Sequence, residues 1–168
     1  AQTWDFDDGN IPSDLTVSNG AVQTGTGTGV SGYFTGTHLN FSGSNQRSLT
    51  LPTANASNGN GTLTFKFIYG SDTNGGEDPD SSPDEEVGLY YSTDDSTWTR
   101  SQYLTPFSDY FSWTSVTVNL TGALANSSIK YKLEQERHNG AGWDNWGIDD
   151  LVLSTTDITA PTITATTV

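Results

Sequence analysis

The stretch Thr62–Tyr69, which reads TLTFKFIY, alternates between polar and apolar side chains. Its apolar set is Leu63, Phe65, Phe67 and Tyr69, and its polar set is Thr62, Thr64 and Lys66. Successive side chains of a β-strand point to opposite faces, so this period of two gathers the apolar set on one face. The stretch therefore predicts a β-strand with one face buried in a core.

The same alternation recurs along the chain, most clearly in Thr114–Leu120 and Ile129–Glu134. Shorter candidates are Trp4–Phe6, Leu15–Val17, Gly32–Phe34, Leu39–Phe41, Ser48–Leu51, Val87–Tyr91 and Ile148–Leu153. No apolar pattern with helical spacing persists for three turns. About ten short strands separated by turn residues predict an all-β fold, an antiparallel β-sandwich. Loops of very unequal length favour a jelly roll over a closed barrel.

Three stretches have the composition of connections rather than strands: Asn19–Gly32, Asn55–Gly61 and Ser71–Glu86. Residues 154–168 are rich in Thr and contain Ala160-Pro161-Thr162, which is typical of a linker. We therefore expect residues 1–153 to form one jelly-roll module. We expect residues 154–168 to form a linker or the start of a following domain, within a longer multidomain protein.

The composition excludes several classes of partner. The 168 residues include 20 Asp and Glu but only 6 Lys and Arg, giving a formal net charge of −14. Binding nucleic acid requires a basic surface, so we exclude it as a partner. No apolar run approaches the roughly 20 residues of a membrane span, so we expect no membrane insertion. The chain has no Cys and no Met, which favours a secreted or cell-surface extracellular protein without disulfides.

The end of the predicted module carries a resemblance. Arg137-His138-Asn139-Gly140, followed by Asp144-Asn145-Trp146-Gly147-Ile148-Asp149-Asp150-Leu151, resembles the close of a reelin repeat. Further segments similar to reelin-repeat strands are His38–Gly43, Phe67–Gly70 and Leu89–Ser92 followed by Trp98. The resemblance spans most of residues 33–153. The chain lacks the disulfide cysteines and the EGF insert of reelin, and it carries an acidic loop where reelin has a neutral one.

The wider clan comprises calcium-carrying jelly rolls, including MAM domains and bacterial carbohydrate-binding modules. Phe6-Asp7-Asp8-Gly9 and Ile148-Asp149-Asp150-Leu151 resemble the opening and closing motifs of those modules. The resemblance implies a jelly roll that holds one structural Ca²⁺ ion and serves binding rather than catalysis.

Four residues are candidate calcium ligands. First and last strands of a jelly roll are commonly neighbours, so Asp7 and Asp149 can converge on one ion, with Asp5 on the same strand face as Asp7. In the pattern of the clan, backbone oxygens of a turn at Gly36–Asn40 lie nearby, so Asn40 joins the set. The alternative is that these carboxylates lie on the surface and accept hydrogen bonds from neighbouring backbone groups.

The loop Ser71–Glu86 concentrates negative charge. Six carboxylates fall within ten residues: Glu77, Asp78, Asp80, Asp84, Glu85 and Glu86. Mutual repulsion among them favours either an extended loop or a bound cation. We expect a solvated loop, and the alternative is a weaker calcium site or a contact for a cationic partner.

Aromatic residues in loops are the candidate ligand-binding surface. Trp143 lies in a Gly-rich turn without apolar neighbours, and Tyr110 and Phe107 share another loop. Aromatic rings stack on the C–H faces of sugars, while nearby polar groups such as Arg137 bond the hydroxyls. For Trp143 and Tyr110, anchoring of the loop is an equally open interpretation. Arg137 has the alternative of pairing with a buried Asp such as Asp150. The remaining tryptophans, Trp4, Trp98, Trp113 and Trp146, are assigned to packing.

No catalytic constellation is present. The two histidines, His38 and His138, lie in no nucleophile or metal motif. Glu134 and Glu136 share a strand face, but this spacing alone does not supply a glycosidase pair. We therefore predict no enzyme but a non-catalytic, calcium-stabilised carbohydrate-binding module of a secreted multidomain protein, with a polysaccharide or glycan as partner. The alternative is a protein-binding adhesion or structural spacer module of an extracellular adhesin, with another extracellular protein as partner.

Overall fold

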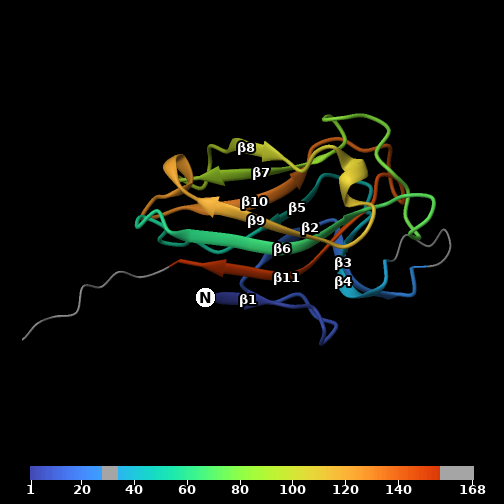
Figure 1. Cartoon of the computed structure of the whole chain (residues 1–168), viewed down its shortest axis with the longest axis horizontal. Helices are drawn as coiled ribbons and strands as arrows, with labels where there is room; N and C mark the ends of the chain where they lie inside the picture. The colour runs from blue at the N-terminus through green and yellow to red at the C-terminus, as the bar shows by residue number, and fades with distance from the viewer. Residues whose placement is uncertain (28–33, 156–168) are drawn as a thin grey trace, which may run out of the picture.

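Two antiparallel sheets pack face to face in the computed structural model, which describes residues 1–27 and 34–155 (Figure 1). The first sheet has the order β3 (Gly20–Gly25), β4 (Gly36–Phe41), β11 (Trp146–Ser154), β6 (Gly61–Tyr69) and β9 (Thr114–Leu120), with β1 (Gln2–Trp4) also paired to β11. The second has the order β2 (Thr16–Ser18), β5 (Arg47–Thr50), β10 (Lys130–Gln135), β7 (Val87–Ser92) and β8 (Thr99–Tyr103). The predicted all-β sandwich is confirmed.

Helical structure within the described ranges is confined to two short 3₁₀ turns, η1 (Phe107–Tyr110) and η2 (Gly122–Leu124). Neither is long or apolar enough to reach across a bilayer, and no other helix occurs in the described part of the chain.

The core lies between the sheets and follows the period-two pattern. Leu63, Phe65, Phe67 and Tyr69 of β6 are all buried. Trp146 of β11 stacks on Phe41 of β4, with ring centroids 3.8 Å apart and planes 9° apart. Trp98 departs from the expectation of core packing, because it is only half-buried and lies under the ammonium group of Lys132, 4.3 Å from the ring centroid.

Several expectations about the strands were wrong. Gly20–Gly25, expected to be part of a connection, is strand β3 and pairs with β4 along its whole length. Gly36–Asn40, expected to be a turn, belongs to strand β4. Strand β8 has the polar sequence TRSQY, so no apolar alternation announces it. The first two residues of the candidate strand Gly32–Phe34 lie outside the described residues. So do residues 156–168, which make up most of the predicted linker of residues 154–168.

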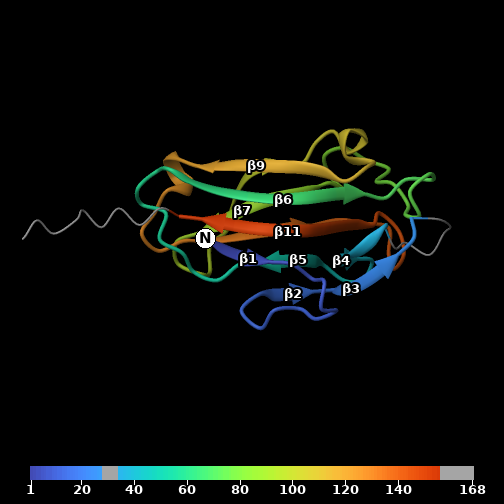
Figure 2. The same ribbon diagram turned by 60° about the horizontal axis from the view of Figure 1, so that its bottom comes forward.

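The last strand, β11, brings the beginning of the chain beside its end (Figure 2). One edge of β11 pairs with β6, so β1 and β4 share the other edge. Strand β4 pairs with Trp146–Ile148, and β1 pairs with Leu151–Leu153. Asp149 and Asp150 lie between these two partners, at a shift in the register with β6. The segment that leaves β1 therefore passes close to Asp149.

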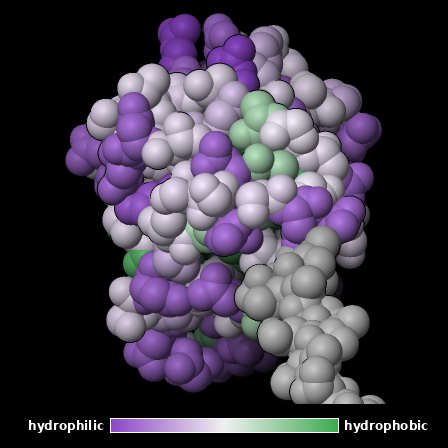
Figure 3. Space-filling model, turned by 90° about the vertical axis from the view of Figure 1, so that its left-hand side faces the viewer, coloured by the Kyte–Doolittle hydropathy of each residue, from purple (hydrophilic) through white to green (hydrophobic). Residues whose placement is uncertain are grey.

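The loops at the two ends of the sandwich differ in character. The loop after β6, the η1 segment and the turn before β11 gather at the right-hand end in Figure 1. The opposite end, seen in Figure 3, is covered mainly by hydrophilic side chains with only small apolar areas. The long loops at the first end are the natural place for a binding site.

Candidate functional site

A cavity of about 370 Å³ opens between the loop after β6 and the turn before β11. Its lining consists of Asp72, Gly75, Gly76, Glu77, Gly142, Trp143 and Asn145. Trp143 is 53% exposed and is one of two large apolar side chains exposed in the described residues, together with Ile11. The structure thus places the predicted aromatic residue beside carboxylate, amide and backbone polar groups.

Arg47 of β5 holds the turn that carries Trp143. Its guanidinium is fully buried and donates five hydrogen bonds, four of them to backbone carbonyl oxygens and one to the side chain of Gln135. Three of those carbonyls belong to the turn, on Gly140, Trp143 and Asp144, at 2.9–3.0 Å. Burial lowers the pKa of Arg47 to about 10, so the guanidinium remains charged at neutral pH. The turn is therefore built around a buried cation.

Gln135 of β10 joins the turn to the acidic loop. Its Nε2 donates to the carbonyls of Glu85 and Asp144 at 2.8 and 2.9 Å. Its Oε1 accepts hydrogen bonds from Arg47 and from the indole of Trp146. This amide is fully buried with all its polar atoms bonded, the condition under which a buried polar group stabilises a unique structure.

The first part of the acidic loop folds back against the end of β6. A Cβ added to Gly70 would lie 2.2 Å from the carbonyl oxygen of Glu77, so glycine is required at this approach. Gly70 N–H donates to the carbonyl of Asn145 at 2.8 Å, and Asn145 N–H donates to the carbonyl of Glu77 at 3.2 Å. These bonds set Glu77 directly against the Trp143 turn.

Three carboxylates meet where the loop and the turn touch. One ligand oxygen from each of Glu77, Asp80 and Asp144 lies within 4.8 Å of the other two. Glu77 Oε2 accepts the backbone N–H of Asp144 at 2.7 Å, while Asn139 donates to both Asp80 and Asp144. Burial raises the pKa of Asp144 to about 6, with further increases from Glu85 and Asp80. Burial also raises the pKa of Glu77. The nearby positive charge of Arg47 lowers the pKa of Asp144 and so offsets these increases in part.

Two of the predicted ligand-binding aromatics lie elsewhere. Tyr110 of η1 is half-buried and packs edge-on against Phe67 and Tyr69, with centroids 5.7 and 5.9 Å apart. Phe107, also half-buried, packs against the core and against Phe111. Neither ring is part of the lining of the Trp143 cavity. Both rings anchor the η1 segment to the sandwich.

Arg137 lies on the surface near the same end. Its side chain is 74% exposed and forms an ion pair of 3.5 Å with Asp84 of the acidic loop. The expectation that it pairs with Asp150 was wrong, because Asp150 pairs with Lys66 at 2.7 Å. Asp150 is half exposed rather than buried. The buried arginine at this end of the sandwich is Arg47, not Arg137.

The structure places the four predicted calcium ligands in different surroundings. Burial raises the pKa of Asp149, and the negative charges of Asp150 and Asp7 raise it further, so Asp7 lies near enough to Asp149 for their charges to interact. Asp5 accepts the backbone N–H of Asp7 at 3.3 Å and so shapes the local turn. Asn40 is buried in β4, where the ladders to β3 and β11 occupy both edges.

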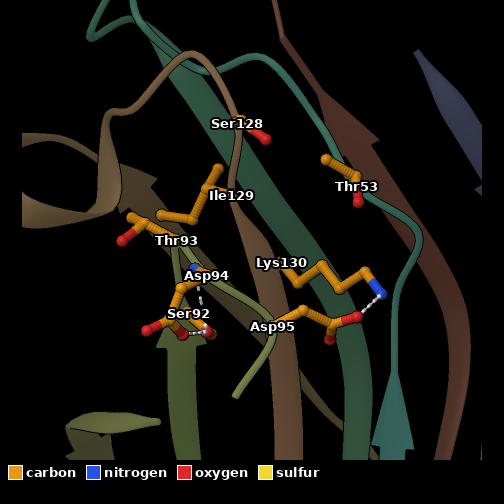
Figure 4. Close-up of a pocket in the computed structure, with 8 residues that line it drawn as sticks. All are labelled: Thr53, Ser92, Thr93, Asp94, Asp95, Ser128, Ile129 and Lys130. Carbon is orange, nitrogen blue, oxygen red and sulfur yellow. Dashed lines mark hydrogen bonds and ion pairs between the residues drawn. The ribbon is translucent and has the colours of Figure 1, made fainter. Parts of the chain in front are cut away.

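A further cavity, of about 260 Å³, opens at the opposite end of the sandwich (Figure 4). Lys130 points across it to Asp95, and the two form an ion pair of 2.8 Å. Asp94 accepts hydrogen bonds from Ser96 N–H and Thr97 N–H, which lower its pKa to about 2. The charged groups of this cavity are therefore engaged in holding the hairpin between β7 and β8.

Comparison with known families agrees with this architecture. The model of the family "Reelin subrepeat B" matches residues 20–154. The chain belongs to the Reelin subrepeat B family. The resemblance predicted from the closing motif is thereby confirmed, and the matched region includes the whole Trp143 turn. No curated protein sequence gives a match to this subrepeat.

Solved structures share the fold of the subrepeat at low sequence identity. The K3 cleaved adhesin domain of Lys-gingipain from Porphyromonas gingivalis W83 has a TM-score of 0.59 and 16% identity, covering 92% of this chain and 98% of that one. TmCBM61, solved with β-1,4-galactotriose, has a TM-score of 0.52 and 18% identity, covering 90% and 94%. An exo-β-agarase structure has a TM-score of 0.57 and 13% identity. The match includes 91% of this chain but only 24% of the agarase chain.

Sequence reasoning missed the polar residues that build the site. Arg47 alternates in phase with Leu49, and Gln135 alternates in phase with Tyr131 and Leu133. Period two alone therefore places both polar side chains on the core face of the subrepeat, at paired positions of neighbouring strands. The sequence signal that could have identified these buried residues is a polar side chain at a position where the alternation calls for an apolar one.

Proposed function

We propose that this subrepeat is a non-catalytic carbohydrate-binding module of a secreted or cell-surface protein, and that the Trp143 cavity holds the glycan. The observation that carries the proposal is the 53% exposed indole of Trp143 at the rim of a cavity of about 370 Å³. An exposed ring stacks on the apolar face of a sugar, and carboxylate, amide and backbone groups bond its hydroxyls.

The structural neighbours support a binding role. TmCBM61 is solved with a galactotriose, and CBM35 from Paenibacillus barcinonensis has a TM-score of 0.51 with 13% identity, covering 93% of this chain and 100% of that one.

The two glutamates that share a strand face, as a glycosidase pair could, have other partners. Glu134 forms an ion pair with Lys132 at 2.9 Å, and Glu136 accepts the hydroxyl of Tyr90. Both carboxylates are thus engaged within the second sheet.

A binding screen with a matched variant tests the glycan proposal. Wild type and Trp143→Ala are run by affinity electrophoresis against soluble polysaccharides, with Ile11→Ala as the control because Ile11 is the other exposed apolar side chain. We expect retardation of wild type and Ile11→Ala by at least one polysaccharide and its loss in Trp143→Ala. Equal retardation of all three proteins would show that the cavity is not the binding site.

We also propose that Asp7 and Asp149 hold a structural calcium ion. Asp149 lies between the segments of β11 that pair with β4 and β1, Asp7 follows β1 in the chain, and burial and the negative charges of Asp150 and Asp7 raise the pKa of Asp149. Calcium prefers hard oxygen ligands and would neutralise the two carboxylates. Bound only by the folded state, an ion at a hundredfold excess over its Kd adds about 2.7 kcal/mol to the free energy of unfolding.

The calcium proposal is tested by thermal melts of Asp149→Asn with calcium and with chelator. The control is Asp150→Asn, because Asp150 is paired with Lys66 instead. We expect Asp149→Asn to lose most of the rise in Tm that calcium gives wild type, and Asp150→Asn to keep it. A full calcium response in Asp149→Asn would remove this residue from the ligands.

A second candidate function is protein binding or spacing within an adhesin. The observation that favours it is the similarity to the K3 adhesin domain of Lys-gingipain, which extends over 98% of that domain. In this arrangement residues 1–153 form the module and residues 154–168 connect it to another domain. Retention of the calcium-dependent melt without retardation by any polysaccharide would favour this function over glycan binding.

A further inference from the structure

The acidic cluster of Glu77, Asp80 and Asp144 has no ion-pair partner in the described part of the chain. Glu77 and Asp80 come from the loop after β6, and Asp144 comes from the turn before β11. None of the three carboxylates takes part in an ion pair within residues 1–27 and 34–155. The buried guanidinium of Arg47 has all its hydrogen bonds directed to carbonyl groups. Three carboxylates therefore lie close together without an ion pair, and the charge of Arg47 offsets that of Asp144 only in part.

An unpartnered oxygen gives an independent indication of a ligand. Asp144 is fully buried, and its Oδ1 has no hydrogen-bond partner, although Oδ2 accepts the N–H of Asn139. The next residue, Asn145, is 2% exposed, and its Oδ1 is also buried without a partner. A buried oxygen left without a partner costs about 1–3 kcal/mol, and more when it is charged, so such atoms in folded proteins usually have a ligand, water or ion.

From this juxtaposition we propose that Glu77, Asp80 and Asp144 form a calcium site, distinct from the Asp7–Asp149 pair. The ligand set consists only of hard oxygens, without His or Cys, which suits Ca²⁺ and excludes the softer transition metals as preferred ions. One oxygen from each of the three side chains already lies within 4.8 Å of the other two, so an ion bridges them without a rearrangement of the backbone.

The proposed ion fastens two loops that are far apart in sequence. Glu77 and Asn145 both line the Trp143 cavity, and Asp144 directly follows Trp143. An ion held between Glu77 and Asp144 therefore fixes one wall of the cavity. If the cavity binds a glycan, the fixed wall raises the affinity for that glycan, and this effect alone rests on the proposed function. The calcium site itself rests on the three carboxylates and the unpartnered oxygen of Asp144.

Calcium titration calorimetry in the Asp149→Asn background tests the site, because that substitution removes the other proposed ion. Asp80→Asn is the test variant, since Asp80 is exposed and its loss disturbs no buried contact. Asp78→Asn is the matched control, being two residues away and outside the cluster. We expect one calcium ion per chain in Asp149→Asn, at least tenfold weaker binding when Asp80→Asn is added, and less than a twofold change with Asp78→Asn. Equal affinity in both double variants, or no calcium bound by Asp149→Asn, would overturn the proposal.

Thermal melts separate an ion site from a network of structural hydrogen bonds. In chelator, Asp80→Asn is expected to leave Tm unchanged or raise it, because one of three repelling carboxylates is removed. In calcium the same variant is expected to lose part of the rise in Tm shown by wild type. An equal fall of Tm in both solutions would assign the cluster a purely structural role. Calcium binding by a protein that binds no glycan would leave this site standing while the proposed function fails.

Discussion

Arg47→Met is predicted to lower the free energy of unfolding of the domain, because it removes the buried cation that supports the candidate site. The substitution keeps a long apolar side chain in the same space but removes all five hydrogen bonds of the guanidinium. It removes a donor from each of the carbonyls of Gly140, Trp143 and Asp144. The Asp144 carbonyl keeps its bond from Gln135, and the Gly140 carbonyl keeps the N–H of Trp143. It also removes the positive charge that opposes the raised pKa of Asp144.

The size of the effect follows from the number of bonds lost and from burial. A hydrogen bond to a charged group contributes about 1.5–3 kcal/mol, but such values are not additive within one network. Removing one partner of a buried charged network costs about 3–5 kcal/mol, and we expect Arg47→Met to fall in that range. In a domain of this size each kcal/mol lowers Tm by about 2–4 °C, so the expected fall is about 6–20 °C.

Urea unfolding followed by tryptophan fluorescence measures this loss, with Arg137→Met as the control. Arg137 lies at the same end of the sandwich, but its side chain is 74% exposed and its single ion pair is 3.5 Å long. Exposed pairs contribute about 0–1 kcal/mol, so this variant should unfold almost as wild type does. The reasoning is refuted if Arg47→Met costs less than about 1 kcal/mol or no more than the control.

Tyr110→Ala should lower the free energy of unfolding by about 2 kcal/mol, because the half-buried ring loses two edge-on contacts with Phe67 and Tyr69. The affinity of the folded variant for glycan should stay unchanged, and a loss of affinity without a loss of stability would instead make Tyr110 a ligand contact. Asp94→Asn should be less stable than wild type above pH 3.8, the ordinary pKa of Asp, because the folded-state pKa is lowered to about 2. The difference should vanish as the pH falls towards 2 in urea titrations, and a difference independent of pH would contradict this origin.

Strands with one buried face were predictable, and those without one were not. The apolar phase of β6, β9, β10 and β11 locates these strands because the sheets bury that phase between them. Strand β8 lies at the edge of the second sheet with exposed polar side chains, so pairing with β7 rather than burial makes it a strand. Strand β3 is likewise an edge strand, rich in small and polar residues, and its pairing with β4 determines its structure.

Within the candidate site, the aromatic residue could be predicted from the sequence, but the contacts that hold its loops together could not. Trp143 is noticeable in the sequence because it is an isolated large ring just after Gly140 and Gly142, and the structure leaves that ring exposed. The proximity of Glu77 to Asp144 depends on closure of the whole sandwich, which brings together loops 67 residues apart in sequence. The expectation of a solvated acidic loop therefore holds for only some of its members. Glu85 accepts the backbone N–H groups of Asp80 and Ser81 and is buried.

The central claim is that glycan binds at the Trp143 cavity. It is tested most directly by two-dimensional ¹H–¹⁵N NMR of the calcium-loaded protein during titration with oligosaccharides selected by the binding screen. The account predicts that the indole N–H of Trp143 and the backbone N–H groups of Gly75, Gly76 and Asn145 shift together and saturate at one affinity. Shifts confined to the cavity between Ser92 and Lys130, or no shift with any oligosaccharide, would contradict it.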